Sequence, residues 1–284
     1  MHPLDGPRLK LVRAKAEIDR LRLMEDAFGK RTKYHVVRAE FNPKSGKYIY
    51  RVRVDGPPPS PEWGVYVGEI AHNLRSALDQ LIYQLALLHT PGETVARSRS
   101  LQFPIFLCRN SLDKTKRGQT FEGRRKDMLG LLLPKHQALI EGLQPYKRGS
   151  STRFKPVGPS QRGSRNSPLF WLKEINNADK HRLIQVVDST IGISLVMDRG
   201  DSGLKRSFTL SRLWSLHQIP HLVILKDGAK FGEADLEMCV DAKISPVIVF
   251  AHSCDMVATM GVCNVLEEIA TRVSQIIESF SPEF

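Results

Sequence analysis

The amino-acid sequence predicts an α+β protein: a helical layer packed on an antiparallel sheet, with an N-terminal β-hairpin and a long C-terminal helix. Two observations support this fold class. Apolar residues recur at helical spacing near both ends of the chain and in its middle, whereas apolar and polar residues alternate in runs that cluster between residues 183 and 250. Because these strands cluster instead of alternating with helices, the pattern favours α+β over parallel βαβ units. We expect a single domain over residues 1–284.

The first part of the chain predicts one helix and one hairpin. Residues 7 to 29 carry apolar residues near helical spacing and end at a glycine. The apolar residues at this spacing are Leu9, Val12, Ala16, Leu21 and Met24. Two alternating runs then flank the turn sequence NPKSG, which is typical of a β-hairpin.

The middle of the chain predicts two helices with polar residues on one side. The segment GPPPSPEW ends the hairpin, and the first of these helices follows over about residues 62–89. A pair of helices interrupted at Pro134 comes next, and the second polar helix begins at Pro168. Between them, residues 145–167 hold six Lys or Arg and no acidic residue, and are rich in Gly, Ser and Pro. We expect this segment, the basic flap, to be a flexible loop.

The last part predicts strands followed by a helix. The runs LIQVVDSTIGISLVMD, LKRSFTL, HLVILKDG and LEMCVDAKISPVIVF have the alternation of antiparallel strands, with LSRLWSLHQIP as a short helical interruption. The final helix is expected from about Asp255 to Phe280. Its apolar face should consist of Val257, Met260, Val265, Ile269, Val273 and Ile276.

The composition is ordinary for a globular protein except in its charge. Hydrophobic residues make up 41% and charged residues 25% of the chain, which argues against extensive disorder. The net charge of +12 and the pI near 9.7 favour phosphate-bearing or other anionic partners. No apolar run is long enough to span a bilayer, and the N-terminus lacks a signal-peptide pattern, so we expect a cytoplasmic protein without a membrane partner.

The first polar helix places His72, Arg75 and Asp79 together on the flank of its apolar sector, at spacings of three and four residues. One interpretation is a solvated face with an Arg75–Asp79 ion pair, which stabilises a helix by roughly 0.2–0.5 kcal/mol. The other is that the three side chains form part of a site.

The second polar helix directs Asn176 and Asp179 into its apolar sector. A buried carboxylate without a partner costs roughly 3–5 kcal/mol, so Asp179 requires a strong donor. Arg75 or His72 on the first helix is the natural candidate, and the two helices are expected to share one polar cluster. Lys180 and His181 lie at the helix C-terminus, where the macrodipole favours cations and offers a purely structural explanation.

Metal, cofactor and nucleophile chemistry find little support in the sequence. His72 and Asp79 are about 10 Å apart along the helix axis, too far to share one ion comfortably, and neither an HExxH motif nor an EF-hand loop is present. The G-x-S-x-G, Walker A and dinucleotide-binding patterns are also absent. Four cysteines without a CxxC pair predict reduced thiols. We therefore expect no metal and no cofactor.

The pairing of HNLRSALDQL with NNADKHRLI resembles a group of bacterial proteins that share an H-N-L-R-x-A-L-D helix and an N-x-x-D-K-H-R segment. The resemblance covers about the middle half of the chain and implies no established activity. The segment RLWSLH, from Arg212 to His217, is similar in spacing to the Arg-x(4–6)-His motif of nucleotide-binding helical domains that act as ribonucleases. It lies among strands instead of on a long bundle helix, so those catalytic roles are not carried over.

Three functions remain open. The leading hypothesis is a module that binds RNA or another polyanion through Arg75, Asn176, Lys180 and, in the basic flap, Lys147, Arg148, Arg153 and Lys155. The second is a metal-independent hydrolase or ribonuclease in which a histidine acts as general base and is oriented by a carboxylate. The catalytic candidates are His72, Asp79, Asp179 and His181. The third is a structural protein in which the polar cluster only sets the helix register.

Overall fold

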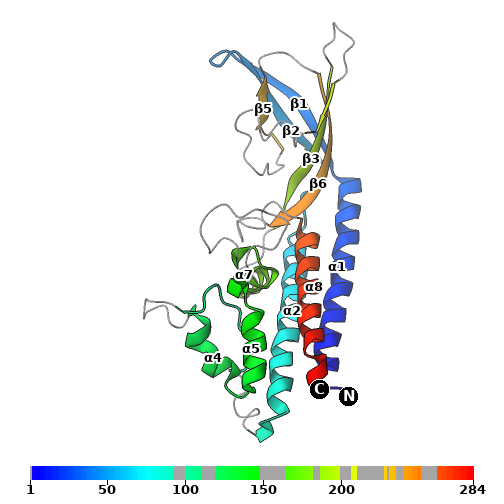
Figure 1. The fold of residues 1–284 in the computed structure, drawn as a ribbon. Coiled ribbons are helices and arrows are strands. Elements are labelled where there is room, and N and C mark those ends of the chain that lie inside the picture. The colour runs from blue at the N-terminus through cyan, green and yellow to red at the C-terminus, as the bar shows by residue number, and fades with distance from the viewer. Residues whose placement is uncertain are drawn as a thin grey trace.

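The computed structural model describes residues 2–92, 100–110, 119–147, 164–181, 186–198, 206–209, 227–228, 230–234, 239–250 and 261–284. It combines helices with antiparallel strands, as expected of an α+β protein. In Figure 1 the helices occupy the lower part of the molecule and the strands the upper part. Both chain ends lie at the lower end of the helices.

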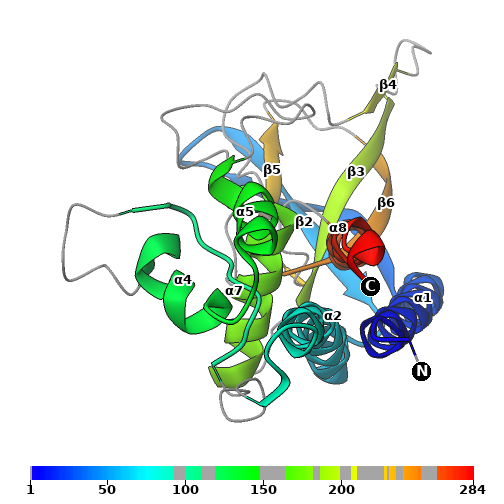
Figure 2. The ribbon, with the colours of Figure 1, turned by 60° about the horizontal axis from the view of Figure 1, so that its bottom comes forward.

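Three long helices lie side by side and form most of the core: α1 (Asp5–Arg31), α2 (Glu62–Leu87) and α8 (Val262–Ser279) (Figures 1 and 2). Most of the apolar sector that helical spacing predicts for α2 is confirmed, because six of its residues are fully buried: Ile70, Leu74, Ala77, Leu78, Leu81 and Leu85. The seventh, Leu88, follows the end of the helix and is 42% exposed, so the sector ends earlier than predicted. The apolar face of α8 is confirmed where it is described, at Val265, Ile269, Val273 and Ile276. Val257 and Met260 lie outside the described residues.

The start of α8 differs from the expectation. The helix begins at Val262, whereas the sequence pattern placed its start near Asp255. Gly261 has a ψ of 140°, which is an extended and not a helical conformation, so the helix does not continue back through this residue.

The apolar residues that recur at helical spacing in α1 are divided between the core and the surface: Leu21 is buried and Met24 packs against the core. Leu9 and Val12 are 60% and 63% exposed, whereas Leu11, Ala14 and Ile18 are buried. The buried stripe repeats at alternating spacings of three and four residues from Leu4 to Leu21 and resumes seven residues later at Phe28, which is the pattern of a helix that packs against its neighbours along most of its length. The helix carries two apolar stripes, and the one that faces α2 and α8 forms the core.

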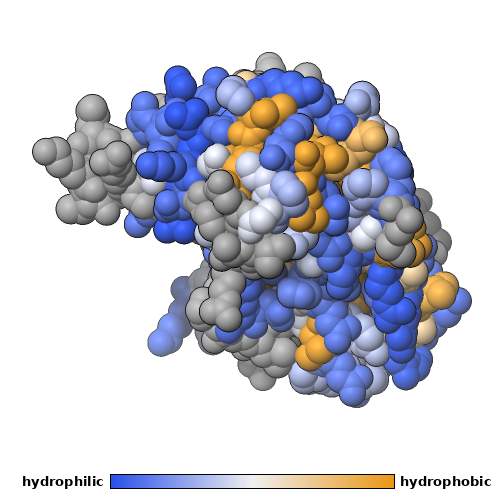
Figure 3. Space-filling model, turned by 90° about the horizontal axis from the view of Figure 1, so that it is seen from below, coloured by the Kyte–Doolittle hydropathy of each residue, from blue (hydrophilic) through white to orange (hydrophobic). Residues whose placement is uncertain are grey.

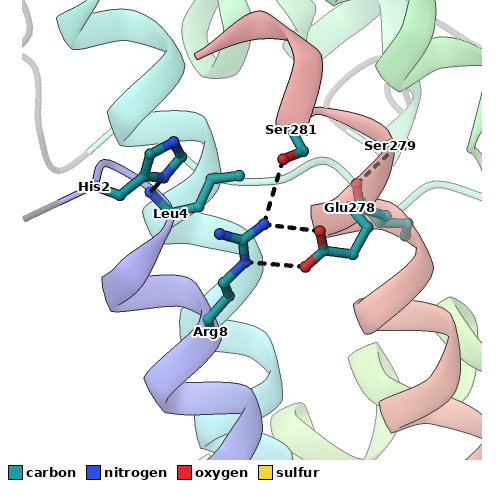
Figure 4. A network of polar contacts seen from close by, with 7 residues as sticks. His2, Leu4, Arg8, Glu278, Ser279 and Ser281 are labelled. Atoms are coloured by element: carbon teal, nitrogen blue, oxygen red, sulfur yellow. Dashed lines mark hydrogen bonds and ion pairs between the residues drawn. The ribbon is translucent and has the colours of Figure 1, made fainter.

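Ion pairs join the first helix to the last. Nε and Nη2 of Arg8 donate to the two carboxylate oxygens of Glu278 at 3.0 and 2.8 Å, and Nη2 also reaches Ser281 Oγ at 3.3 Å (Figure 4). Ser281 begins the short helix η4 (Ser281–Glu283). Further along the same interface, Nη2 of Arg22 lies 2.7 Å from a carboxylate oxygen of Glu267. The Arg8 contacts fasten the start of α1 to the end of α8, and the Arg22 contact joins the second half of α1 to the first half of α8.

The strands form two antiparallel sheets. The predicted hairpin is confirmed as β1 (Lys33–Asn42) and β2 (Lys47–Asp55), joined by a turn in which Gly46 has a φ of 67°, a value that favours glycine. β5 (Lys230–Ala234), which the sequence pattern did not predict, pairs with β2. In the second sheet, β3 (Val186–Asp198) lies between β4 (Arg206–Thr209) and β6 (Cys239–Phe250). The run LSRLWSLHQIP and most of HLVILKDG lie outside the described residues.

Shorter helices cover one side of α2. The pair interrupted at Pro134 is confirmed as α4 (Phe121–Leu129) and α5 (Pro134–Gly142), followed by η2 (Pro145–Lys147). The second polar helix, α7 (Pro168–His181), contacts both α2 and α8. The edges of the basic flap are more structured than expected, since Pro145, Ser164 and Ser167 are buried. Residues 148–163 of the flap lie outside the described residues.

The surface seen from below is mainly hydrophilic, with hydrophobic residues in separate patches (Figure 3). Across the part of the chain that the structure describes, no helix is both long enough and apolar enough to cross a membrane.

Candidate functional site

A pocket of about 280 Å³ lies between α2 and α7. Its wall on α2 is a polar stripe formed by His72, Ser76, Asp79 and Tyr83, at successive spacings of four, three and four residues. Residues at these spacings share one face of an α-helix. The stripe lies beside the apolar sector that faces the core, so α2 uses one side for packing and the adjoining side for the pocket.

The wall on α7 is formed by Asn176 and Lys180, one helical turn apart. Asn176 is only 5% exposed, and none of the described residues forms a hydrogen bond with its side-chain amide. Lys180 is exposed, and among the described residues no carboxylate lies within ion-pair distance of its ammonium group. The two side chains therefore present hydrogen-bonding groups to the pocket that the described part of the protein does not use.

Arg75 and Asp79 form a clamp on a neighbouring segment of the chain. Arg75 Nη2 lies 2.9 Å from Asp79 Oδ1 and donates to the backbone carbonyl of Phe103 at 2.7 Å. The backbone N–H of Phe103 donates to Asp79 Oδ1 at 2.8 Å. Both backbone groups of the fully buried Phe103 are thus held by α2, and Leu101, two residues earlier, completes the pocket lining. The Arg75–Asp79 pair predicted as a solvated alternative exists, but it is partly buried and binds the backbone.

Burial controls the electrostatics of Asp79. It raises the pKa of this carboxyl group above its ordinary value, whereas the charge of Arg75 and the hydrogen bond from Phe103 N–H act in the opposite direction. The side chains of Arg75 and Asp79 are 14% and 29% exposed. Lys180 adds a further favourable charge at longer range. Asp79, the only carboxylate among the described residues that line the pocket, is therefore already matched by a cation.

Asp179 does not occupy the place that the helical wheel predicted. Its side chain is exposed and does not line the pocket, so it needs no buried partner. Its carboxylate lies against Gly68 on α2, where a Cβ atom would overlap it. Arg75, the expected partner of Asp179, pairs with Asp79 on its own helix. The physical reason is that Asp179 lies in the last turn of α7, where the helix crosses the edge of α2 and is open to solvent.

The remaining predicted residues are not brought into the pocket by the described structure. Lys147 Nζ lies 3.3 Å from Glu141 Oε1, in an ion pair beside α5. His181 ends α7, and its side chain lies outside the described part of the structure. Arg148, Arg153 and Lys155 belong to the undescribed part of the basic flap.

The catalytic hypothesis lacks an oriented base in the described residues. Asp79 is occupied by Arg75 and Phe103, since its Oδ2 accepts from Arg75 Nε at 3.2 Å and its Oδ1 from Phe103 N. No described carboxylate forms an ion pair or hydrogen bond with His72, which is exposed at the pocket. Hydrolysis at this site stays a prediction.

Four lining residues were missed by the sequence argument: Ser76, Gln80, Tyr83 and Leu101. The first three continue the polar side of α2 by about one, two and three turns beyond His72, so the helical wheel contained a signal for them. The role of Leu101 follows from the clamp on Phe103, which the wheel of a single helix cannot show. Searched over the described residues, the structure holds no cluster of three His, Cys, Asp or Glu side chains suited to a metal ion.

Comparisons of the chain with protein-family models, with curated proteins and with solved structures find no match. The site must therefore be interpreted from its own geometry.

Proposed function

We propose that this protein binds a phosphate-bearing ligand in the pocket between α2 and α7. The observation that supports the proposal is the unused polar lining of the pocket. The side chain of Asn176 lines the pocket, and no described residue forms a hydrogen bond with its amide, so the amide's donors and acceptor are free to bind a ligand. A ligand with several acceptor oxygens would satisfy this amide and the ammonium group of Lys180 together.

The charge of the pocket favours an anionic ligand. Arg75 and Asp79 balance each other, so Lys180 adds one positive charge and His72 contributes ring nitrogens. Ammonium and amide N–H groups are donors that phosphate oxygens accept, and hydrogen bonds to an ionised group are the stronger kind. Ser76 and Gln80 supply further neutral hydrogen-bonding groups along α2.

The net charge of +12 supports RNA or another polyanion as the natural source of the phosphate, in the cytoplasm. A basic surface attracts such a molecule at long range, and the pocket gives one part of it a defined position. The Lys and Arg residues of the basic flap would add electrostatic attraction for the polyanion without forming part of the pocket.

The salt dependence of binding to a 5′-phosphorylated single-stranded RNA hexanucleotide tests the proposal. Fluorescence anisotropy titrations at 50, 100 and 200 mM KCl give the slope of log K against log salt. If the pocket neutralises one or two phosphates, the slope should be about −0.7 to −1.4, whereas five phosphates held by the basic flap would give about −3.5.

Variants locate the binding site. Lys180→Ala and Asn176→Ala should each weaken binding several-fold, whereas Lys15→Ala, which removes the same charge from the exposed side of α1, should change it little. The proposal is wrong if the wild-type protein shows no binding at 50 mM salt. It is also wrong if Lys180→Ala and Lys15→Ala bind with equal affinity, because the phosphate would then lie outside the pocket.

A further inference from the structure

The pocket extends along α2 far enough to have two chemically different ends. His72 and Tyr83 both line it and are eleven residues apart, which corresponds to about 16 Å along the helix axis. Eleven residues are close to three full turns, so both side chains project from the same side of the helix. A ligand bound along this stripe meets different groups at its two extremities.

The end at His72 is polar and cationic. The contact of Asp179 with Gly68 places the last turn of α7 beside the N-terminal half of α2, one turn from His72. Lys180 belongs to the same turn of α7, and Asn176 lies one turn earlier. The ammonium group of Lys180 and the amide of Asn176 line the same pocket as the imidazole of His72, and Lys180 is near enough to Asp79 to lower the pKa of its carboxyl group.

The end at Tyr83 is aromatic. Tyr83 is half-buried, packs against the hydrophobic core and lines the pocket, so its ring is held in place by its neighbours. Leu101, which is 4% exposed, adds an apolar contact and lies two residues before Phe103, whose backbone α2 holds. A supported ring beside an aliphatic side chain is the kind of surface on which a nucleobase stacks.

The volume of the pocket and the number of its free cations limit the ligand to one phosphate group in the pocket. A volume of about 280 Å³ is at the lower limit of small-molecule sites, which span about 300–1,000 Å³. Lys180 is the only lining cation without an ion-pair partner among the described residues. A terminal phosphomonoester carries about −1.5 to −2 charges at pH 7 and three acceptor oxygens, which match clustered donors better than an internal phosphodiester does.

We infer that the pocket binds the terminal phosphomonoester of a nucleotide, with the phosphate at Lys180 and Asn176 and the base against Tyr83. The inference rests on the proposed function and specifies its ligand class. The same chemistry is present in a free nucleoside monophosphate and at the 5′ end of an RNA strand. An internal stretch of RNA, which has no terminal phosphate, is excluded as the preferred ligand.

Four probes test the inference by isothermal titration calorimetry: adenosine monophosphate, adenosine, and an RNA hexanucleotide with either a 5′-phosphate or a 5′-hydroxyl end. Adenosine monophosphate should bind roughly tenfold to a hundredfold more tightly than adenosine, the range that charge-assisted hydrogen bonds supply. The phosphorylated hexanucleotide should exceed its hydroxyl counterpart by a similar factor if strand ends are the source. Preference for adenosine monophosphate over both hexanucleotides identifies a free nucleotide as the source.

Matched variants separate the two ends of the pocket. Lys180→Ala should remove most of the difference between adenosine monophosphate and adenosine. Tyr83→Leu should weaken both ligands, whereas Tyr83→Phe, which keeps the ring, should preserve binding. Thermal melts of each variant show whether the fold is retained, and Tyr83→Phe provides a test that does not depend on the loss of a core contact.

The outcomes distinguish this inference from the proposed function. If the two hexanucleotides bind equally and Lys180→Ala weakens both, the protein binds phosphate in the pocket but does not select a terminal phosphomonoester, and the inference is overturned. Unchanged binding in Tyr83→Leu overturns the placement of the base. If no phosphate-bearing probe binds, the proposed function itself fails.

Discussion

Asp79 and Arg75 illustrate how single side chains organise the site. Together they hold both backbone groups of Phe103, whose ring is fully buried. Removing the carboxylate by Asp79→Ala leaves the guanidinium group of Arg75 and one backbone N–H without their partner in a partly buried setting. We expect the free energy of unfolding, measured by urea denaturation, to fall by roughly 2–4 kcal/mol.

Two controls make this result specific. Asp79→Asn keeps an acceptor for the N–H of Phe103 and should lose less stability than Asp79→Ala. Asp179→Ala removes an exposed carboxylate and should change stability by less than about 0.5 kcal/mol. Equal losses in Asp79→Ala and Asp179→Ala would show that the clamp on Phe103 contributes nothing measurable.

At the residue scale, the sequence pattern predicts correctly the relation between side chains of the same helix. It placed His72, Arg75 and Asp79 on one side of α2, because the period of a helix alone fixes this relation. It failed for Asp179, whose exposure depends on where α7 crosses α2. A helical wheel gives the direction of a side chain but not the position at which the neighbouring helix ends.

At the scale of helices, the crossing of α2 and α7 depends on the absence of a side chain at Gly68. The carboxylate of Asp179 occupies the space that a Cβ atom would fill. In a helix interior, alanine is more favourable than glycine by roughly 0.5–1 kcal/mol. Gly68→Ala should gain this amount in an Asp179→Ala background, but gain less or destabilise the protein when Asp179 is present.

A double-mutant cycle by urea denaturation measures the difference. The expected coupling free energy between positions 68 and 179 is about 0.5 kcal/mol or more, the lower limit for residues in contact. Effects that add within about 0.3 kcal/mol would mean that the carboxylate moves away from α2 without cost, and that the close contact does not position α7.

The first helix shows why the position of a helix in the sequence is easier to predict than which of its faces is buried. The helix was predicted over residues 7–29 and spans Asp5–Arg31, because apolar and charged residues at helical spacing indicate its period. Two apolar stripes share that period: Leu9 and Val12 lie on the exposed one, whereas Leu21 lies on the buried one. The choice between stripes is made by α2 and α8, which are distant in sequence.

At the scale of the whole molecule, the alternation of apolar and polar residues predicted most of the strands. It did not predict which strands pair with each other. β2 pairs with β5 across about 180 residues, and nothing in the local pattern of either run specifies that pairing. The pocket has the same origin, since it is built from α2, α7 and the segment at Leu101. The sequence identified which residues are polar on each helix, and the packing of distant segments decided which of them meet.

The two chain ends are fastened by carboxylates, which makes the stability of the whole molecule sensitive to acid. The hydrogen bond from Arg8 holds the pKa of Glu278 below its ordinary value. The pKa of Glu283 is lowered by Lys135 and then by His136, which connect η4 to α5. For a carboxyl group with a lowered pKa, the unfolded chain binds the proton more readily. Its stabilising contribution is therefore present above the ordinary pKa and is lost as the pH falls through the lowered one.

Melting temperatures measured between about pH 5 and pH 3 test this dependence, because glutamate side chains titrate in that range. Glu278→Gln and Glu283→Gln should each lower the melting temperature at pH 5 and flatten its decline toward pH 3, because the variant side chain no longer takes up a proton. Glu174→Gln, on the half-buried side of α7 away from both chain ends, serves as the control and should retain the wild-type decline. An unchanged decline in both terminal variants would show that acid acts elsewhere in the molecule and that these ion pairs do not hold the chain ends.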